Sequence, residues 1–181
     1  MDAFVAMRKY ISSGSIEQKY INKLVLDDHD KILSLEKSFN KFEEKRIVNE
    51  IYFKGQIYDA YSKIKDIFSK AKKKLIIIDG YADKTLLNMI KDLTFNVILI
   101  TKKYNKLKDL DIEKYNSQYH NLRVIYDDTF HDRYFILDKE IIYHSGTSIN
   151  NAGSKTFSIN VLEDKLVKEF LIKNVKDIIK Y

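Results

Sequence analysis

Residues 130–155 read FHDRYFILDKEIIYHSGTSINNAGSK, and they predict two adjacent strands followed by a polar turn. The segments RYFILD, EIIYHSG and, just beyond them, TFSINVL are separated only by short turns, which is typical of antiparallel strands. The same stretch holds a histidine, an arginine and an aspartate in the register H-x-R-x-x-x-x-D. The other strands of a sheet that contains these segments must come from the residues on either side of this stretch.

Upstream of this stretch, short apolar runs alternate with helical patterns. LIIID (75–79), NVILIT (96–101) and LRVIYD (122–127) are unbroken runs, which indicate strands covered on both faces in a parallel or mixed sheet. IVNEIYFKG, from Ile47, predicts a first strand. The expected helices lie near 57–71, 84–93, 106–119 and 166–178. The sequence therefore predicts an α/β domain with a mixed parallel and antiparallel sheet flanked by helices.

The residues before this domain predict a long helix. Gly14 ends the first segment, and Ser15 with Gln18 forms a capping box that opens a helix reaching about Arg46. Apolar residues recur there at the a and d positions of a coiled coil, with Asp28 in one d position: Val25, Ile32, Leu35, Phe39 and Phe42. We expect residues 1–46 to form a dimerisation helix and residues 47–181 the α/β domain.

Composition narrows the classes of function. The chain has 181 residues, 45% of them hydrophobic, enough for one core, and it has no cysteine, so disulfides and thiolate chemistry are excluded. The four histidines have no metal-ligand spacing, and DGYAD is no phosphate-binding or dinucleotide fingerprint, so we expect neither metal nor cofactor. No apolar run is long enough for a signal or membrane segment, which favours a cytoplasmic protein.

The charge of the chain has two interpretations. The formal net charge is +6, from 32 Lys and Arg residues against 26 acidic residues. Such a balance attracts polyanions, which makes nucleic acid a candidate partner. The basic residues are spread along the chain, however, and they also fit an ordinary solvated surface.

The polar residues of 130–155 are the main candidates for a site. In a strand, residues two apart share a face, so His131 and Arg133 are expected to point the same way. Imidazole can attack phosphorus or donate a proton, and guanidinium can bind two phosphate oxygens. In the following turn, Ser148 and Asn150 can add hydrogen-bond donors, and Lys155 can add charge.

Other polar residues have simpler interpretations. Asp138 is placed to cap a turn, and His144 faces either the same pocket or solvent. Asp79, Tyr81 and Asp83 follow the LIIID strand, at the edge where α/β proteins bind ligands. For these three residues the favoured interpretation is the acidic start of a helix.

H-x-R-x-x-x-x-D followed by G-T-S-I-N resembles the H-x-K-x-x-x-x-D signature of the phospholipase D superfamily, in which a downstream G-S-x-N completes the phosphate pocket. The resemblance covers about residues 47–181 and is concentrated in 130–151. It implies a phospholipase D-like fold and a metal-independent reaction through a phosphohistidine, with a second motif supplying the acid. Since this chain has one motif, the resemblance implies a homodimer that binds or hydrolyses nucleic-acid phosphodiesters.

The resemblance also implies roles for individual residues: His131, Arg133 and Asp138 in catalysis, and Ser148, Asn150 and Lys155 at the phosphate. The sequence departs from the family pattern in three ways. Arginine replaces lysine at 133, one extra residue separates Gly146 from Ser148, and Ser158 and Asn160 stand where single-motif nucleases carry a glutamate. Degenerate members of the family bind phosphate ligands or serve in assembly without cleavage.

The first residues, MDAFVAMRKYIS, resemble the segment after the DNA-binding domain of phage antirepressor-like regulators of the KilA-N type. In those regulators such a helix leads into a coiled coil and a variable C-terminal domain. This resemblance implies an alternative function, a catalytically retired oligomerisation or ligand-sensing domain of a phage-type transcriptional regulator.

Overall fold

The computed structural model describes residues 16–44 and 49–180. The chain divides into two compact units, residues 1–46 and residues 47–181. The predicted Ser15 cap lies outside the described residues. Among the helices of the described ranges, none has the length and apolar character needed to cross a membrane.

The first unit contains one long helix, α2 (Ile16–Glu44). Several large apolar side chains on α2 are exposed, including Ile32 at 54% and Leu35 at 65%. A long N-terminal helix was predicted and is observed. The predicted pairing of this helix as a coiled coil stays a prediction, and the side chains of Phe39 and Phe42 lie outside the described residues.

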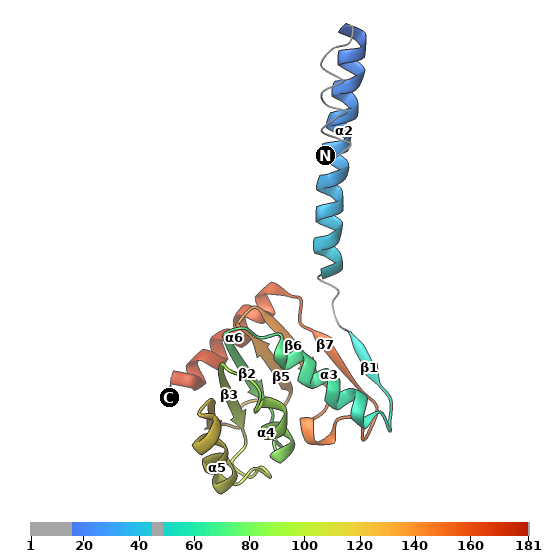
Figure 1. Ribbon diagram of the computed structural model, residues 1–181. Coiled ribbons are helices and arrows are strands. Elements are labelled where there is room, and N and C mark those ends of the chain that lie inside the picture. Colours follow the sequence, from blue (N-terminus) through green and yellow to red (C-terminus); the bar gives the residue numbers. More distant parts are fainter. Residues whose placement is uncertain (1–15, 45–48, 181) are drawn as a thin grey trace. The chain divides into compact units, whose positions relative to one another are not determined.

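The second unit is built on a seven-stranded sheet with the order β1-β7-β6-β5-β2-β3-β4 (Figure 1). Its strands are β1 (Glu50–Tyr52), β2 (Lys74–Ile78), β3 (Asn96–Thr101), β4 (Leu122–Tyr126), β5 (Arg133–Leu137), β6 (Ile141–Ser145) and β7 (Phe157–Val161). Strands β2, β3 and β4 are parallel, and β5 joins β2 antiparallel. The remaining pairs, β5 with β6, β6 with β7 and β7 with β1, are also antiparallel. The predicted mixed sheet is confirmed.

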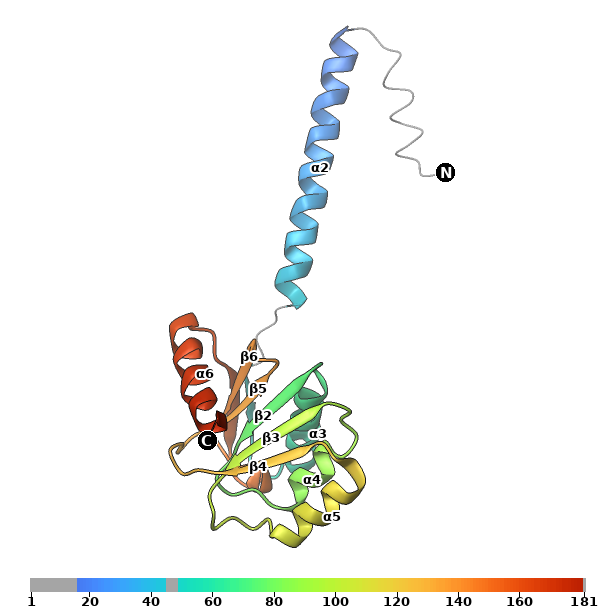
Figure 2. The same ribbon diagram turned by 90° about the vertical axis from the view of Figure 1, so that its left-hand side faces the viewer.

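Helices cover both faces of the sheet, as the unbroken apolar strands predicted (Figure 2). The helices are α3 (Ile57–Ser69), α4 (Lys84–Ile90), α5 (Asp109–Tyr119) and α6 (Lys165–Lys180), with a short 3-10 turn, η1 (Ile149–Asn151). Alternate residues of β2 separate the two cores. Leu75 and Ile77 pack with α3 and α4, whereas Ile76 and Ile78 pack under α6.

Local sequence signals explain several element boundaries. Asp83 caps α4, because its carboxylate accepts a hydrogen bond of 2.8 Å from the Thr85 amide. His120 ends α5 in the left-handed conformation, with φ 56°. Gly153, with φ +77°, lies close to the start of α3, and its carbonyl accepts a hydrogen bond of 2.8 Å from the Gly55 amide.

Gly153 is the glycine whose replacement we expect to cost most. A Cβ atom at this position would lie 2.6 Å from the Gln56 oxygen and 2.6 Å from the Ile57 Cα. A Cβ atom at Gly146 would meet backbone only at 3.5 Å. Gly153→Ala should therefore lower the free energy of unfolding by at least about 2 kcal/mol, with Gly146→Ala as the mild control. Urea denaturation of both variants checks this, and equal losses would contradict it.

Candidate functional site

The candidate site lies where β2 and β3 end and β5 begins. Ile78 is the register partner of Tyr134, so Asp79 and Arg133 follow at the same edge of the sheet. Arg133 pairs on its other side with Ser145, the last residue of β6. Antiparallel pairing of β5 thus brings the first residue of one strand beside the ends of its two neighbours.

Asp79 is the buried centre of this edge, with no exposed surface. Both of its carboxylate oxygens accept a bond of 2.8 Å from the Ser148 hydroxyl. The Ile149 amide donates at 2.8 Å and the Tyr81 amide at 3.0 Å. Burial raises the pKa of Asp79 above its usual range, and these bonds and the charge of Arg133 oppose that rise.

Arg133 and Lys102 flank the ring of Tyr81. The Arg133 Cζ lies 5.6 Å from the ring centroid and the Lys102 Nζ 5.8 Å, distances at which cations are attracted to an aromatic face. The Arg133 Nε is buried and has no hydrogen-bond partner among the described residues. Two cations and a half-exposed aromatic ring therefore meet at this edge.

His131 lies two residues before β5, and its side chain is exposed. It makes no hydrogen bond, ion pair or ring contact with any residue that the structure describes. The strand rule that was expected to set His131 beside Arg133 does not extend to it, because the strand begins at Arg133. The rule does hold within β5, where Phe135 and Ile136 enter opposite cores.

The three predicted phosphate-binding residues have different environments. Ser148 is buried, and its hydroxyl donates a hydrogen bond to Asp79. This hydroxyl would have to break that bond before it could donate to a phosphate. Asn150 is half-buried, and its Oδ1 has no hydrogen-bond partner among the described residues. Lys155 is exposed on the segment between η1 and β7. Their role at a phosphate stays a prediction.

Asp138 is at the opposite end of β5 from Arg133. The strand rises about 3.3 Å per residue, so five residues separate the two by about 16 Å. The Asp138 carboxylate accepts bonds of 2.8, 2.8 and 2.9 Å from the amides of Lys72, Lys73 and Lys74. Asp138 therefore anchors a distant loop in this structure, rather than only the turn that follows it, and it does not meet the other candidate residues.

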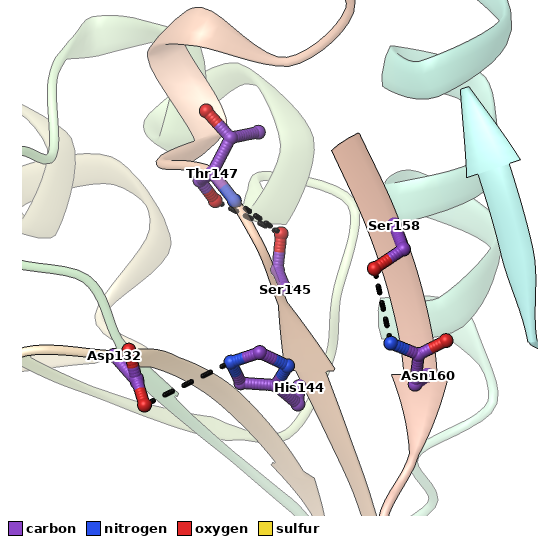
Figure 3. A network of polar contacts seen from close by, with 6 residues as sticks. All are labelled: Asp132, His144, Ser145, Thr147, Ser158 and Asn160. Atoms are coloured by element: carbon purple, nitrogen blue, oxygen red, sulfur yellow. Dashed lines mark hydrogen bonds and ion pairs between the residues drawn. The ribbon is translucent and has the colours of Figure 1, made fainter. Parts of the chain in front are cut away.

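A second polar group lies on the α6 face of the sheet, near the same edge (Figure 3). The Nε2 of His144 is 3.9 Å from a carboxylate oxygen of Asp132, and its ring centroid is 5.4 Å from that of Tyr134. Asn160 is the strand partner of His144 and donates a bond of 3.0 Å to the Ser158 hydroxyl. Ser158 and Asn160 thus hydrogen-bond to each other on this face.

Two features of the edge were missed or misread from the sequence. Asp79 was interpreted as part of a helix start, but its partners are Ser148 and Ile149, which are 69 and 70 residues away. Lys102 was not singled out, although it follows the NVILIT strand at the same edge. Within the described residues, no group of three or more acidic or histidine side chains could hold a metal ion.

Asp138 gives a test of pH-dependent stability. Hydrogen bonds from the amides of Lys72, Lys74 and Lys73 lower the pKa of Asp138 below its usual value. The stability that this carboxylate contributes is then present above the unfolded pKa of about 3.9 and is lost as pH falls through the folded pKa. Asp138→Asn should lower the melting temperature at pH 7, and its difference from the parent protein should shrink between about pH 5 and pH 2.

Thermal melts across this pH range measure the effect. Asp128 is exposed, so Asp128→Asn is a matched control that should leave the melting temperature nearly unchanged. A deficit in Asp138→Asn that is independent of pH would contradict the anchoring role.

The sequence matches no protein-family model and no curated protein. Solved structures do resemble the α/β unit. NucT from Helicobacter pylori aligns with a TM-score of 0.58 and 14% identity, over 75% of this chain and 97% of NucT. Nuc from Salmonella typhimurium, a phospholipase D family member, aligns with a TM-score of 0.57 and 12% identity, over 75% of this chain and 95% of Nuc. With its mixed seven-stranded sheet between two layers of helices, the unit formed by residues 47–181 therefore has the phospholipase D-like fold.

Proposed function

We propose that the chain is a half-site phosphodiesterase domain that pairs with a second copy and hydrolyses nucleic-acid phosphodiesters through His131. The observation that carries the proposal is the free, exposed imidazole of His131, two residues before the guanidinium of Arg133. Arg133 lies beside the ring of Tyr81, and its charge acts on the buried Asp79, so a cation is present at this edge of the sheet. The net charge of +6 favours a polyanionic substrate.

The reaction divides the roles between two chains. A ring nitrogen of His131 attacks phosphorus, the bond from phosphorus to the leaving oxygen breaks, and His131 of the second copy donates a proton to that oxygen. Water then attacks the phosphohistidine, its proton passes to the second imidazole, and the first imidazole is released. Arg133 binds the non-bridging phosphate oxygens in both steps.

Exposed apolar side chains on α2 support the pairing of two chains. Ile32 and Leu35 occupy a and d positions of the heptad pattern and are more than half exposed. Helices in proteins gain most of their stability from packing. Pairing with a second copy would bury the apolar a and d residues along the 29 residues of α2 and would therefore stabilise this helix. Pairing through α2 would bring two His131 side chains into one assembly.

Cleavage assays on the intact chain test the mechanism. His131→Ala should lower cleavage of a labelled single-stranded DNA or RNA oligonucleotide by at least about a thousandfold, because the nucleophile is lost. His120→Asn is the matched control, since His120 is exposed and asparagine tolerates its left-handed conformation. EDTA should leave the rate unchanged. Full activity in His131→Ala, or its loss in EDTA, would disprove the mechanism.

One observation favours a second candidate, a retired ligand-sensing or oligomerisation domain of a phage-type regulator. The Ser148 hydroxyl is already donated to Asp79, and the Asp79 charge offsets part of the charge of Arg133. Such a domain would bind a phosphate-bearing ligand without turnover. Saturable binding of the oligonucleotide that is weakened in Arg133→Gln, with no cleavage by the parent protein, would select this candidate.

Both proposed functions predict a dimer that forms through α2. Ile32→Asp in the intact chain should weaken dimerisation by at least about a hundredfold, because a charge would enter the apolar seam. Ser34→Asp is the control, since it adds the same charge to an exposed position off the seam. Sedimentation equilibrium compares the two variants. A dimer as strong in Ile32→Asp as in Ser34→Asp would show that α2 is not the joint.

A further inference from the structure

A groove lies between the C-terminal half of α6 and the sheet, at the end of the sheet away from the candidate site. Figure 2 shows α6 along one face of the strands. Its inner part is a cavity of about 230 Å³, and the residues lining it come from β2, β5, α6 and the turn after β5: Lys74, Ile76, Ile136, Lys139, Ile172, Val175, Lys176, Ile179 and Lys180. An open outer part of about 570 Å³ shares Lys139, Ile172, Lys176 and Lys180 with it.

The floor of this cavity is hydrocarbon. Ile76 and Ile136 come from neighbouring strands and are 3% and 1% exposed, and Val175 on α6 is 1% exposed. Ile172 and Ile179 complete the apolar wall from the helix. The inner cavity would therefore favour an apolar group over water.

The rim of the same cavity is cationic. Four of its nine lining residues are lysines and none is acidic, so no carboxylate inside the cavity balances their charge. Lys74, Lys139, Lys176 and Lys180 make no ion pair with any described residue. Two acids, Glu169 and Asp177, line only the outer part, and Glu169 lies 3.9 Å from Lys165.

The cations at the inner part of the groove repel one another. Burial lowers the pKa of Lys74, and repulsion from Lys139 and Arg123 lowers it further. The guanidinium of Arg123 donates a hydrogen bond of 3.1 Å to the Ile179 carbonyl, which holds a fifth cation near the end of α6. An anion at this rim would relieve the repulsion among these groups.

We propose that this groove binds a small amphiphilic anion, a carboxylate or phosphate monoester that carries a hydrocarbon chain. The chain would occupy the isoleucine floor, and the head group would lie among Lys74, Lys139, Lys176 and Lys180. Lysine stems commonly cover apolar surface with the ammonium group in water, but such packing leaves no cavity beneath them. A nucleic-acid strand would use the lysines and leave the floor empty, so the amphiphile fits the lining better. This site is separate from the phosphodiester site of the proposed function.

Calorimetric titration of the intact chain with straight-chain carboxylates, from butanoate to decanoate, tests the proposal. Each added methylene that enters the cavity should raise the affinity up to about fourfold. The rise should end when the cavity is full. Sodium phosphate, which has charge without a chain, and octanol, which has a chain without charge, should both bind far more weakly than octanoate.

Variants locate the binding. Lys74→Gln and Lys176→Gln should each weaken octanoate binding about fivefold, because each removes one partly solvated charge. Lys91→Gln is the matched control, since Lys91 is an exposed lysine at the end of α4 and does not line the groove. His131→Ala should bind octanoate normally, so this result and that of the cleavage assay are independent.

Four outcomes would overturn the proposal. They are the absence of octanoate binding, an affinity that does not change with chain length, octanol binding as tightly as octanoate, and equal weakening by Lys91→Gln. An oligonucleotide whose affinity falls in Lys74→Gln, without any binding of octanoate, would assign the groove to nucleic acid instead. Binding to anionic lipid vesicles without binding of the free carboxylate would assign it to a membrane surface.

Discussion

The buried carboxylate of Asp79 is the constraint on which this edge of the domain depends. A carboxylate taken out of water costs several kcal/mol unless donors and an opposite charge surround it. Here the donors come from the Ser148 hydroxyl and the Ile149 amide, 69 and 70 residues further along the chain. The segment after β6 is thereby bound to the end of the central strand β2, and Arg133 begins the strand that pairs with β2 at this edge.

This arrangement would have two opposite effects on the binding of a phosphate at this edge. It places the cation of Arg133 beside the Tyr81 ring at this edge of the sheet, which favours an anion there. It also places a negative charge behind the guanidinium and occupies the Ser148 hydroxyl, which weakens the attraction for a phosphate. Tyr81 and Lys102 add an aromatic face and a second cation on the open side. The affinity of this edge for an anion would depend on the balance between these effects.

The parts of the structure that could be predicted from sequence are those fixed by local pattern. The unbroken runs LIIID and NVILIT form parallel strands that are covered on both faces. Asp83 caps α4 through the amide of Thr85, two residues away. Asp79 could not be placed in this way, because its partners depend on how distant segments meet. The expected alignment of His131 with Arg133 stays a prediction for a related reason: alternation along a strand says nothing about where that strand begins, and β5 begins at Arg133.

The motif that carries the resemblance spans β5 and the residues just outside it, and its two ends have different environments. His131 is exposed and makes no hydrogen bond or ion pair with a described residue, while Asp138 ties down the backbone before β2 through three amides. Replacing His131 would remove no hydrogen bond or ion pair with a described residue, whereas replacing Asp138 would release three backbone amides before the central strand. A sequence pattern that counts both ends equally therefore combines a residue that the fold needs with one that it does not.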